Sequence, residues 1–238
     1  AILTVLLLWS FAFITGLSPS VVRSVFMFSL LALSQINSGR MLSVHTLSVA
    51  AFFMLIYNPM WIFDVGFQLS FIAVLGIVLI QPKLYFLVKI QNPVLKYFWG
   101  IITVSIAAQI ATAPLVIFYF SRFSTHFLLT NLWVILLVTI IVYGAVIMLI
   151  VSPVIWLSQA VADVLMILIG GLNASVRWVE SLPYSSFDNL WLHHWDVILF
   201  YLALLSFICL IISFKKKYVF AFIGCLFLIT SHHLWLKI

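Results

Sequence analysis

Charged residues are scarce in this sequence. Only 7% of its 238 residues are Asp, Glu, Lys or Arg, and Asp and Glu together number 5. Soluble domains carry about 25% charged residues, so this composition excludes a water-soluble globular domain. With 66% hydrophobic residues and a mean hydropathy of +1.32, the chain is predicted to be an all-α membrane protein, a polytopic helical bundle.

Residues that carry chemistry are equally scarce. The 2 cysteines, Cys209 and Cys225, lie in apolar runs without the spacing of a metal site, which indicates thiols packed as small hydrophobic groups. No phosphate-binding loop, nucleophile elbow or HExxH stretch is present. The stretch HHWD at 193–196 lacks the spacing of a metallohydrolase and is interpreted as an interfacial turn. We therefore predict no enzyme, no catalytic residue, no metal and no cofactor.

Long apolar runs divide the chain into about 7–9 transmembrane or interfacial helices. The first run already begins at Ala1, which indicates a fragment of a longer protein. One segment, 42–57, is short enough to be re-entrant, and the amphipathic segment 153–178 fits an interfacial helix as well as a channel wall. The expected segments are 1–15, 20–36, 42–57, 65–81, 98–120, 126–151, 153–178, 195–214 and 218–236.

Proline and lysine indicate where helices end and how they are oriented. Ser152-Pro153 predicts a helix start, with Ser152 as the N-cap and Pro153 at the first helical position. Asn58-Pro59 predicts the end of the helix before it. Lysine and arginine favour cytoplasmic loops. The lysines within 83–96 and those at 215–217 are separated by four expected segments, so both groups can face the cytoplasm. Asp64, the Arg122 loop and 180–196 then lie outside.

Arg23 lies one turn after a helix start predicted at Pro19. The free N–H groups of a helix start, together with a fixed cation, suit a phosphate or a carboxylate. The alternative is that Arg23 extends to the lipid headgroups.

The stretch DVGFQLSF at 64–71 places polar and small residues at the head of a membrane helix. Asp64 is predicted to cap this helix. Gly66 and Ser70, one turn apart, predict a seam of close helix packing. Gln68 lies one turn deeper than Asp64 and indicates either a buried hydrogen bond or a polar cavity.

Segment 98–120 combines small residues with an amide and a proline. Ala107 and Ala111 form a small-residue pair at helical spacing. Gln109 lies mid-membrane, and Pro114 leaves the carbonyl of Ile110 without its usual donor. Interrupted helices occur at transport sites and also as ordinary kinks, and both interpretations stay open.

Several stretches, in this order, resemble the competence domain of the bacterial ComEC family: GLSPSVVRSVFMF, NPMWIFDVGFQLSFIAVLGIVL, AAQIATAPLVIFYFSRFS and LTNLWVI. WVESLPYSSF is similar to the closing Leu-Pro stretch of that domain, so the resemblance is strongest over 16–185. It implies a single transmembrane competence domain over 1–238, in which 186–238 adds C-terminal membrane helices.

The resemblance implies a multi-pass channel of the bacterial inner (cytoplasmic) membrane that takes up single-stranded DNA during natural transformation. Its implied partners are the DNA strand, the lipid bilayer, a DNA receptor, a cytoplasmic motor and a second copy in a homodimer. The metallo-β-lactamase-like nuclease domain common in the family has no counterpart in this sequence. Two alternatives remain: an ion-coupled transporter of a small anion, with Asp64 or Asp163 as proton carrier, and a membrane module that positions soluble domains.

A DNA strand carries one negative charge per nucleotide, so its route cannot be plain hydrocarbon. The chain offers a net charge of +6 and aromatic side chains on which bases stack, worth about 1–3 kcal/mol per base. A sparse positive lining suits conduction, which requires weak binding. The expected DNA path or pore lining is Arg23, Asp64, Gln68, Gln109, Arg122 and Asn131, and the expected packing or kink residues are Gly66, Ser70 and Pro114.

Overall fold

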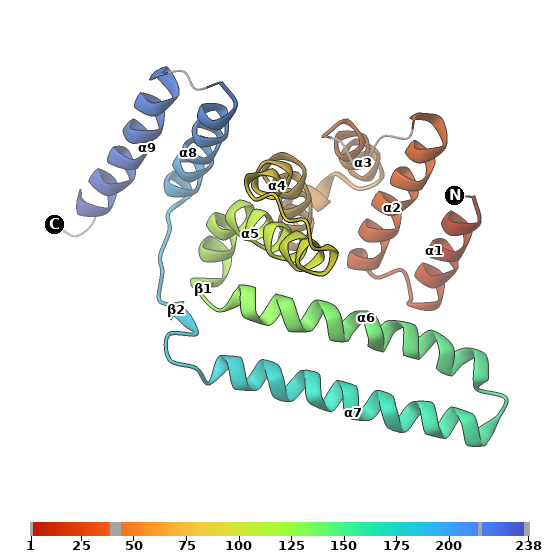
Figure 1. Ribbon diagram of the computed structural model, residues 1–238. Coiled ribbons are helices and arrows are strands. Elements are labelled where there is room, and N and C mark those ends of the chain that lie inside the picture. The colour runs from red at the N-terminus through yellow and green to blue at the C-terminus, as the bar shows by residue number, and fades with distance from the viewer. Residues whose placement is uncertain (1, 39–43, 214–215, 236–238) are drawn as a thin grey trace. The chain divides into compact units, whose positions relative to one another are not determined.

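The chain is an all-α membrane protein with one short two-stranded ribbon (Figure 1). The computed structural model describes residues 2–38, 44–213 and 216–235. The helices are α1 (Ile2–Ile14), α2 (Pro19–Ser38), α3 (Val44–Tyr57), the 3-10 helix η1 (Pro59–Phe63), α4 (Val65–Leu87), α5 (Pro93–Phe120), α6 (Phe127–Val151), α7 (Ile155–Glu180), α8 (His194–Ser213) and α9 (Lys216–Trp235). The strands are β1 (Arg122–Ser124) and β2 (Ser186–Asp188).

Four helices within the described ranges, α4 to α7, are long and apolar enough to cross a membrane. The segment whose placement stayed open, 153–178, corresponds to α7, which is one continuous helix of 26 residues. In contrast, the 14 residues of α3 span about 21 Å, which is less than the hydrocarbon core of about 30 Å. The expected segment 42–57 begins at 42–43, and these two residues, like Lys215, lie outside the described residues.

One predicted helix start was wrong. Ser152 is the C-cap of α6, with helical angles (φ −53°, ψ −30°), and the N-cap of α7 is Val154. Pro153 therefore lies in the connection between the two helices. Proline is also common one or two residues after a C-cap because it cannot continue a helix. The prediction for Asn58-Pro59 is confirmed, since α3 ends at Tyr57 and the Asn58 side chain caps η1.

The chain forms two compact units. The first unit comprises Ala1–Val88, Ala107–Tyr119 and Leu192–Ile238. A small core of Met27, Leu47 and Ala50, from α2 and α3, is covered by apolar side chains of α2 and α4. α4 also approaches α5 closely, since a Cβ on Gly76 would lie 2.3 Å from the Cβ of Ala111 and 2.9 Å from the carbonyl oxygen of Ala107.

The second unit comprises Lys89–Ile106 and Phe120–Trp191. In it α6 and α7 run side by side in opposite directions (Figure 1). β1 precedes α6, β2 follows α7, and the two strands pair antiparallel with Arg122 opposite Asp188 and Ser124 opposite Ser186. Because side chains alternate along a strand, these four polar residues share one face of the ribbon.

Candidate functional site

A partly buried ion pair joins α2 to the start of α4. Pro19 begins α2, so Arg23 lies one turn inside this helix, where only 7% of it is exposed. Its Nη1 donates to Oδ1 of Asp64 over 2.9 Å. A buried charge is tolerated when it is paired and hydrogen-bonded, and Asp64 provides that pairing. Arg23 thus faces protein and not the lipid headgroups.

Asp64 has a second role, at the junction of η1 and α4. Its backbone N–H closes η1 on the carbonyl of Trp61, and its side chain accepts from the N–H of Phe67 over 2.6 Å. The predicted helix cap is therefore confirmed. The Arg23 side chain is 9% exposed and that of Asp64 is 45% exposed, so the pair is enclosed on the arginine side and open on the carboxylate side.

Gly66 provides the space for this ion pair. A Cβ at Gly66 would lie 2.6 Å from Nη2 of Arg23 and 3.2 Å from Oδ1 of Asp64. The nearest neighbour of Gly66 is thus an arginine side chain, whereas we expected a second helix backbone. The close helix contact lies ten residues later, at Gly76. Ser70 is half-buried on α4.

Gln68 makes hydrogen bonds at both ends of its amide. Its Nε2 donates to the carbonyl of Ile62 over 2.8 Å, and its Oε1 accepts from the hydroxyl of Tyr119 over 2.8 Å. The sequence predicted either a buried hydrogen bond or a polar cavity for Gln68, and the structure shows two hydrogen bonds that are both exposed. It also adds Tyr119, at the end of α5, which sequence reasoning missed because the contact spans 51 residues.

An aromatic pocket of about 370 Å³ lies in the first unit, and Arg23 and Asp64 are not among its lining residues. It extends between α1, the start of α2, α3 and η1. Val22 and Phe26, which flank Arg23 on α2, form part of its wall. Its other lining residues are Trp9, Leu17, Pro19, Phe53, Met54, Tyr57 and Trp61. The ring centroids of Tyr57 and Trp61 are 5.6 Å apart, so the pocket offers flat aromatic surfaces, and two of its α2 residues, Val22 and Phe26, lie within one turn of Arg23.

Gln109 does not join this cluster. It is half-buried on α5, and the ten residues between it and Tyr119 correspond to about 15 Å of helix. It also lies about 200° around the helix from Ala107, away from the face that contacts Gly76. The structure thus separates Gln109 from Gln68, although the sequence assigned both residues to one path.

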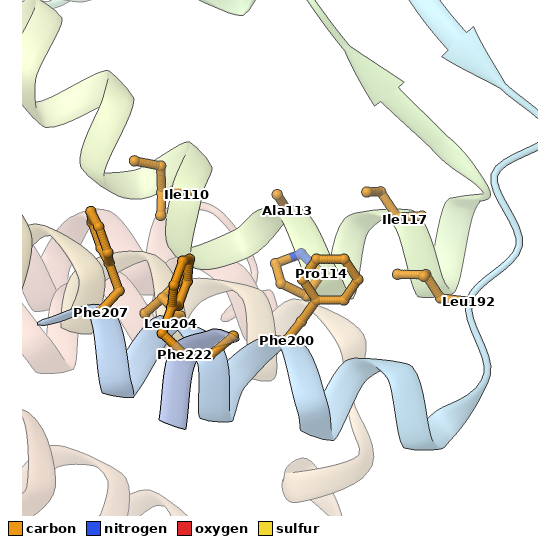
Figure 2. Close-up of a pocket in the computed structure, with 10 residues that line it drawn as sticks. Ile110, Ala113, Pro114, Ile117, Leu192, Phe200, Leu204, Phe207 and Phe222 are labelled. Carbon is orange, nitrogen blue, oxygen red and sulfur yellow. The ribbon is translucent and has the colours of Figure 1, made fainter. Parts of the chain in front are cut away.

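Pro114 lies within α5, and Tyr201 of α8 bonds the backbone of this helix close to it. The Tyr201 hydroxyl donates to the carbonyl of Ala111 over 3.0 Å, and the backbone of Leu115 is a further hydrogen-bond partner of Tyr201. An apolar cavity of about 350 Å³ adjoins this point, with side chains of α5 facing those of α8 (Figure 2).

The remaining two predicted path residues lie in the second unit. The Arg122 Nε donates to Oδ1 of Asp188 over 2.9 Å, and its Nη2 donates to Oγ of Ser186 over 3.0 Å. Both charged side chains are exposed, by 58% and 66%, and an exposed pair contributes about 0–1 kcal/mol. Asn131 is half-buried in the first turns of α6.

Asp196 is a further buried carboxylate that the sequence analysis did not single out. It is fully buried in the first turn of α8 and accepts from the backbone N–H of His193 over 2.8 Å. An acidic residue at the third helical position that bonds back to the residue before the helix is half of a capping box. The signal was present in HHWD, which the sequence analysis treated only as a turn. Within the described part of the chain, no three His, Cys, Asp or Glu side chains form a group able to hold a metal.

Comparison with known proteins gives two matches. A family model described as "Competence protein" matches residues 1–214. The curated protein "ComE operon protein 3" of Bacillus subtilis (strain 168) is 27% identical over 124 residues, which cover 52% of this chain and 15% of that relative. The matched region is thus a small part of the relative. No solved structure matches the chain.

Proposed function

This chain belongs to the ComEC family of competence proteins, and on that premise we propose that it forms the membrane path by which a single strand of DNA enters the cell. The observation that carries this proposal is the ion pair of Arg23 and Asp64, enclosed on one side and open on the other. The amide of Gln68 follows one turn after Asp64, and the neighbours of Arg23 on α2 line an aromatic pocket.

The ion pair provides a way to handle one phosphate at a time. Asp64 is an oxygen anion held against Arg23, and a DNA phosphate is an oxygen anion of the same charge. Because the carboxylate side is open, an arriving phosphate can replace Asp64 at the guanidinium, and Asp64 can take the position back. An arginine that always has a competing partner binds each phosphate weakly, which conduction requires.

The aromatic pocket provides a place for the base of the same nucleotide. Its volume of about 370 Å³ falls within the range of about 300–1,000 Å³ typical of small-molecule sites. Stacking on Trp61 or Tyr57 is tolerant of sequence, since every base has a π face. A phosphate at Arg23 and a base in the aromatic pocket together form one nucleotide position on the path.

Further parts of the proposal rest on the family alone. We place the protein in the bacterial inner membrane, where a DNA receptor delivers the strand and a cytoplasmic motor pulls it. Two copies of the chain can assemble as a homodimer. The hydrolysis of the second strand belongs to other proteins or domains. Gln109 and Asn131 remain predicted path residues, and they lie apart from the Arg23 pair along the chain. For Arg122, the third predicted path residue outside that pair, the polar pocket beside it favours a different role.

The proposal is tested by replacing the two path amides in the gene that encodes this chain. Gln68→Leu and Gln109→Leu are expected to leave the protein in the membrane but to abolish transformation, because each removes a polar group that the strand passes. Transformation frequency and membrane protein level are measured together. Gly171→Ala, where a Cβ would meet nothing within 4 Å, is the control. Normal DNA uptake in both leucine variants contradicts the path assignment.

A reconstitution separates the three candidate functions. Purified protein in liposomes is supplied with labelled single-stranded DNA or with small anions. Entry of the strand supports the channel. Small-anion flux that stops when the proton gradient is dissipated, and that loses this coupling in Asp64→Asn, supports the transporter and overturns the channel. If neither the strand nor the small anions enter the liposomes, the result supports a module that only positions other domains.

A further inference from the structure

A polar pocket of about 260 Å³ lies in the second unit, where the ribbon meets the ends of α6 and α7. Its walls carry one arginine, one carboxylate, the imidazole of His126 and several hydroxyl groups. Those used below are Arg122 and Ser186 from the ribbon, Ser185 just before β2, Thr130 from α6 and Glu180 from the end of α7.

Arg122 retains unused hydrogen-bond donors in this pocket. The guanidinium group has five N–H donors. One bonds Asp188 and one bonds Ser186, so three remain to bind a ligand oxygen. The hydroxyl of Ser185 lies on the same pocket wall, whereas that of Thr130 already donates to the carbonyl of His126 over 3.2 Å. This donor set matches the oxygens of a phosphate group.

The charge balance of the pocket excludes a purely anionic ligand. The charge of Arg122 is already neutralised by Asp188. Glu180 adds a negative charge, and no ion pair of Glu180 is found among the described residues. Arg177, one turn earlier on α7, is not part of the pocket wall. A ligand with both a phosphate and an ammonium group can pair its ammonium with Glu180 while its phosphate takes hydrogen bonds from Arg122, whereas a DNA strand brings only further negative charge to Glu180.

The surroundings place this pocket at the level of lipid headgroups. α6 has no buried residue, so its apolar surface faces lipid. Four exposed aromatic side chains flank the pocket along the chain, at the end of α7 and around β2. They are Trp178 (57% exposed), Tyr184 (79%), Phe187 (51%) and Trp191 (73%). Such aromatic belts mark the interface between membrane and water.

We propose that this pocket binds the headgroup of a zwitterionic phospholipid that carries a primary ammonium. The phosphate accepts hydrogen bonds from Arg122 and the hydroxyl of Ser185, and the ammonium donates to Glu180. The volume of about 260 Å³ is below the range of about 300–1,000 Å³ for larger ligands, which favours a headgroup over a nucleotide. Arg122 then anchors the protein in the bilayer and does not contact the DNA strand.

The order in which the unaltered protein retains lipids tests this assignment. Purified protein is exchanged into mixed micelles with phosphatidylethanolamine, phosphatidylcholine or phosphatidylglycerol, and bound lipid is counted by native mass spectrometry. We expect phosphatidylethanolamine to be retained about tenfold better than the other two, which corresponds to about 1.4 kcal/mol. The choline ammonium has no N–H to donate, and the glycerol headgroup has no cation. Equal retention of all three lipids overturns the proposal.

Two variants assign the effect to the pocket. Glu180→Gln is expected to remove the preference for phosphatidylethanolamine, and Arg122→Gln to weaken retention of all three lipids. Asp163→Asn, an exposed acid on the same helix, is the control and should change nothing. In a parallel arm, labelled single-stranded DNA is titrated into the unaltered protein and into Arg122→Gln. DNA binding that depends on Arg122 and is competed by no lipid overturns the proposal and returns Arg122 to the strand path.

Discussion

Arg23 and Asp64 each satisfy a requirement of the other. Arg23 needs an anion because it is buried, and Asp64 is held in place because its Oδ1 caps α4 and accepts from Arg23 at once. The cap was readable from sequence, since capping depends on residues three apart. The ion pair was not, because its partners are 41 residues apart and nothing local links them.

Replacing Asp64 separates these two roles. Asparagine caps helices about as well as aspartate, so Asp64→Asn removes only the charge. We expect it to destabilise the protein by about 1–3 kcal/mol, less than the 3–5 kcal/mol for a fully buried pair, since Asp64 is half exposed. Asp64→Ala should cost about 1 kcal/mol more, because the cap is also lost. Unfolding of the purified protein in detergent micelles measures both changes.

A double mutant tests whether the cost comes from the pair. Arg23→Gln with Asp64→Asn leaves no unpaired buried charge. The double variant should therefore be more stable than the sum of the two single changes predicts. Strictly additive costs would show that the two side chains do not stabilise each other.

At the scale of whole elements, small residues determine which helices can touch. Gly76 of α4 lies directly against Ala111 and the Ala107 carbonyl of α5. The sequence analysis identified the alanine pair but assigned the glycine side of such contacts to Gly66. Helical spacing predicts which residues share a face, but it does not show which faces meet. The partner of a small-residue stripe therefore has to come from the structure.

Gly76→Ala is expected to loosen the contact between α4 and α5. Its new methyl group would meet a backbone oxygen and a Cβ that cannot move aside, and such overpacking costs about 1–3 kcal/mol. Gly171→Ala is the matched control, because its Cβ meets nothing and alanine is favoured over glycine in helices by up to about 1 kcal/mol. The midpoint temperature of thermal unfolding should fall for the first variant and stay level or rise for the second. An unchanged midpoint in Gly76→Ala contradicts the close contact.

Helix positions followed well from sequence, since apolar runs and prolines bound them. Expected and observed helices overlap along the chain, although α4 continues through Pro82 to Leu87 and α5 begins earlier, at Pro93. The short ribbon was not predicted, because three-residue strands carry too few positions for an alternating pattern. Tyr201 was missed for the same reason as Arg23 and Asp64: its contact with α5 spans 90 residues.

At the scale of the whole molecule, the distribution of lysine predicts the orientation in the membrane. The described lysines at 83, 89 and 96 lie around the connection between α4 and α5, and Lys217 lies near the start of α9. Four helices, α5 to α8, separate the two groups. If all four cross the membrane, both groups lie on the cytoplasmic side.

Cysteine labelling tests this orientation. In a protein whose Cys209 and Cys225 are replaced by alanine, single cysteines are placed at Lys89 and Ser181, both exposed. A maleimide that cannot cross membranes should label Ser181→Cys in intact cells but Lys89→Cys only after the cells are opened. Labelling of both positions in intact cells would mean that an odd number of helices between them fails to cross.

Under the proposed function, the pairing of Arg23 with Asp64 also predicts how the membrane potential acts on this site. The membrane potential acts on net charge, and carrying one elementary charge through 100 mV changes the energy by about 2.3 kcal/mol. Held together at 2.9 Å, the two side chains have no net charge, so the resting site does not sense the potential. If a phosphate replaces Asp64 as proposed, the carboxylate becomes an uncompensated charge. The proposal therefore predicts that the voltage across the membrane influences how readily the pair forms again.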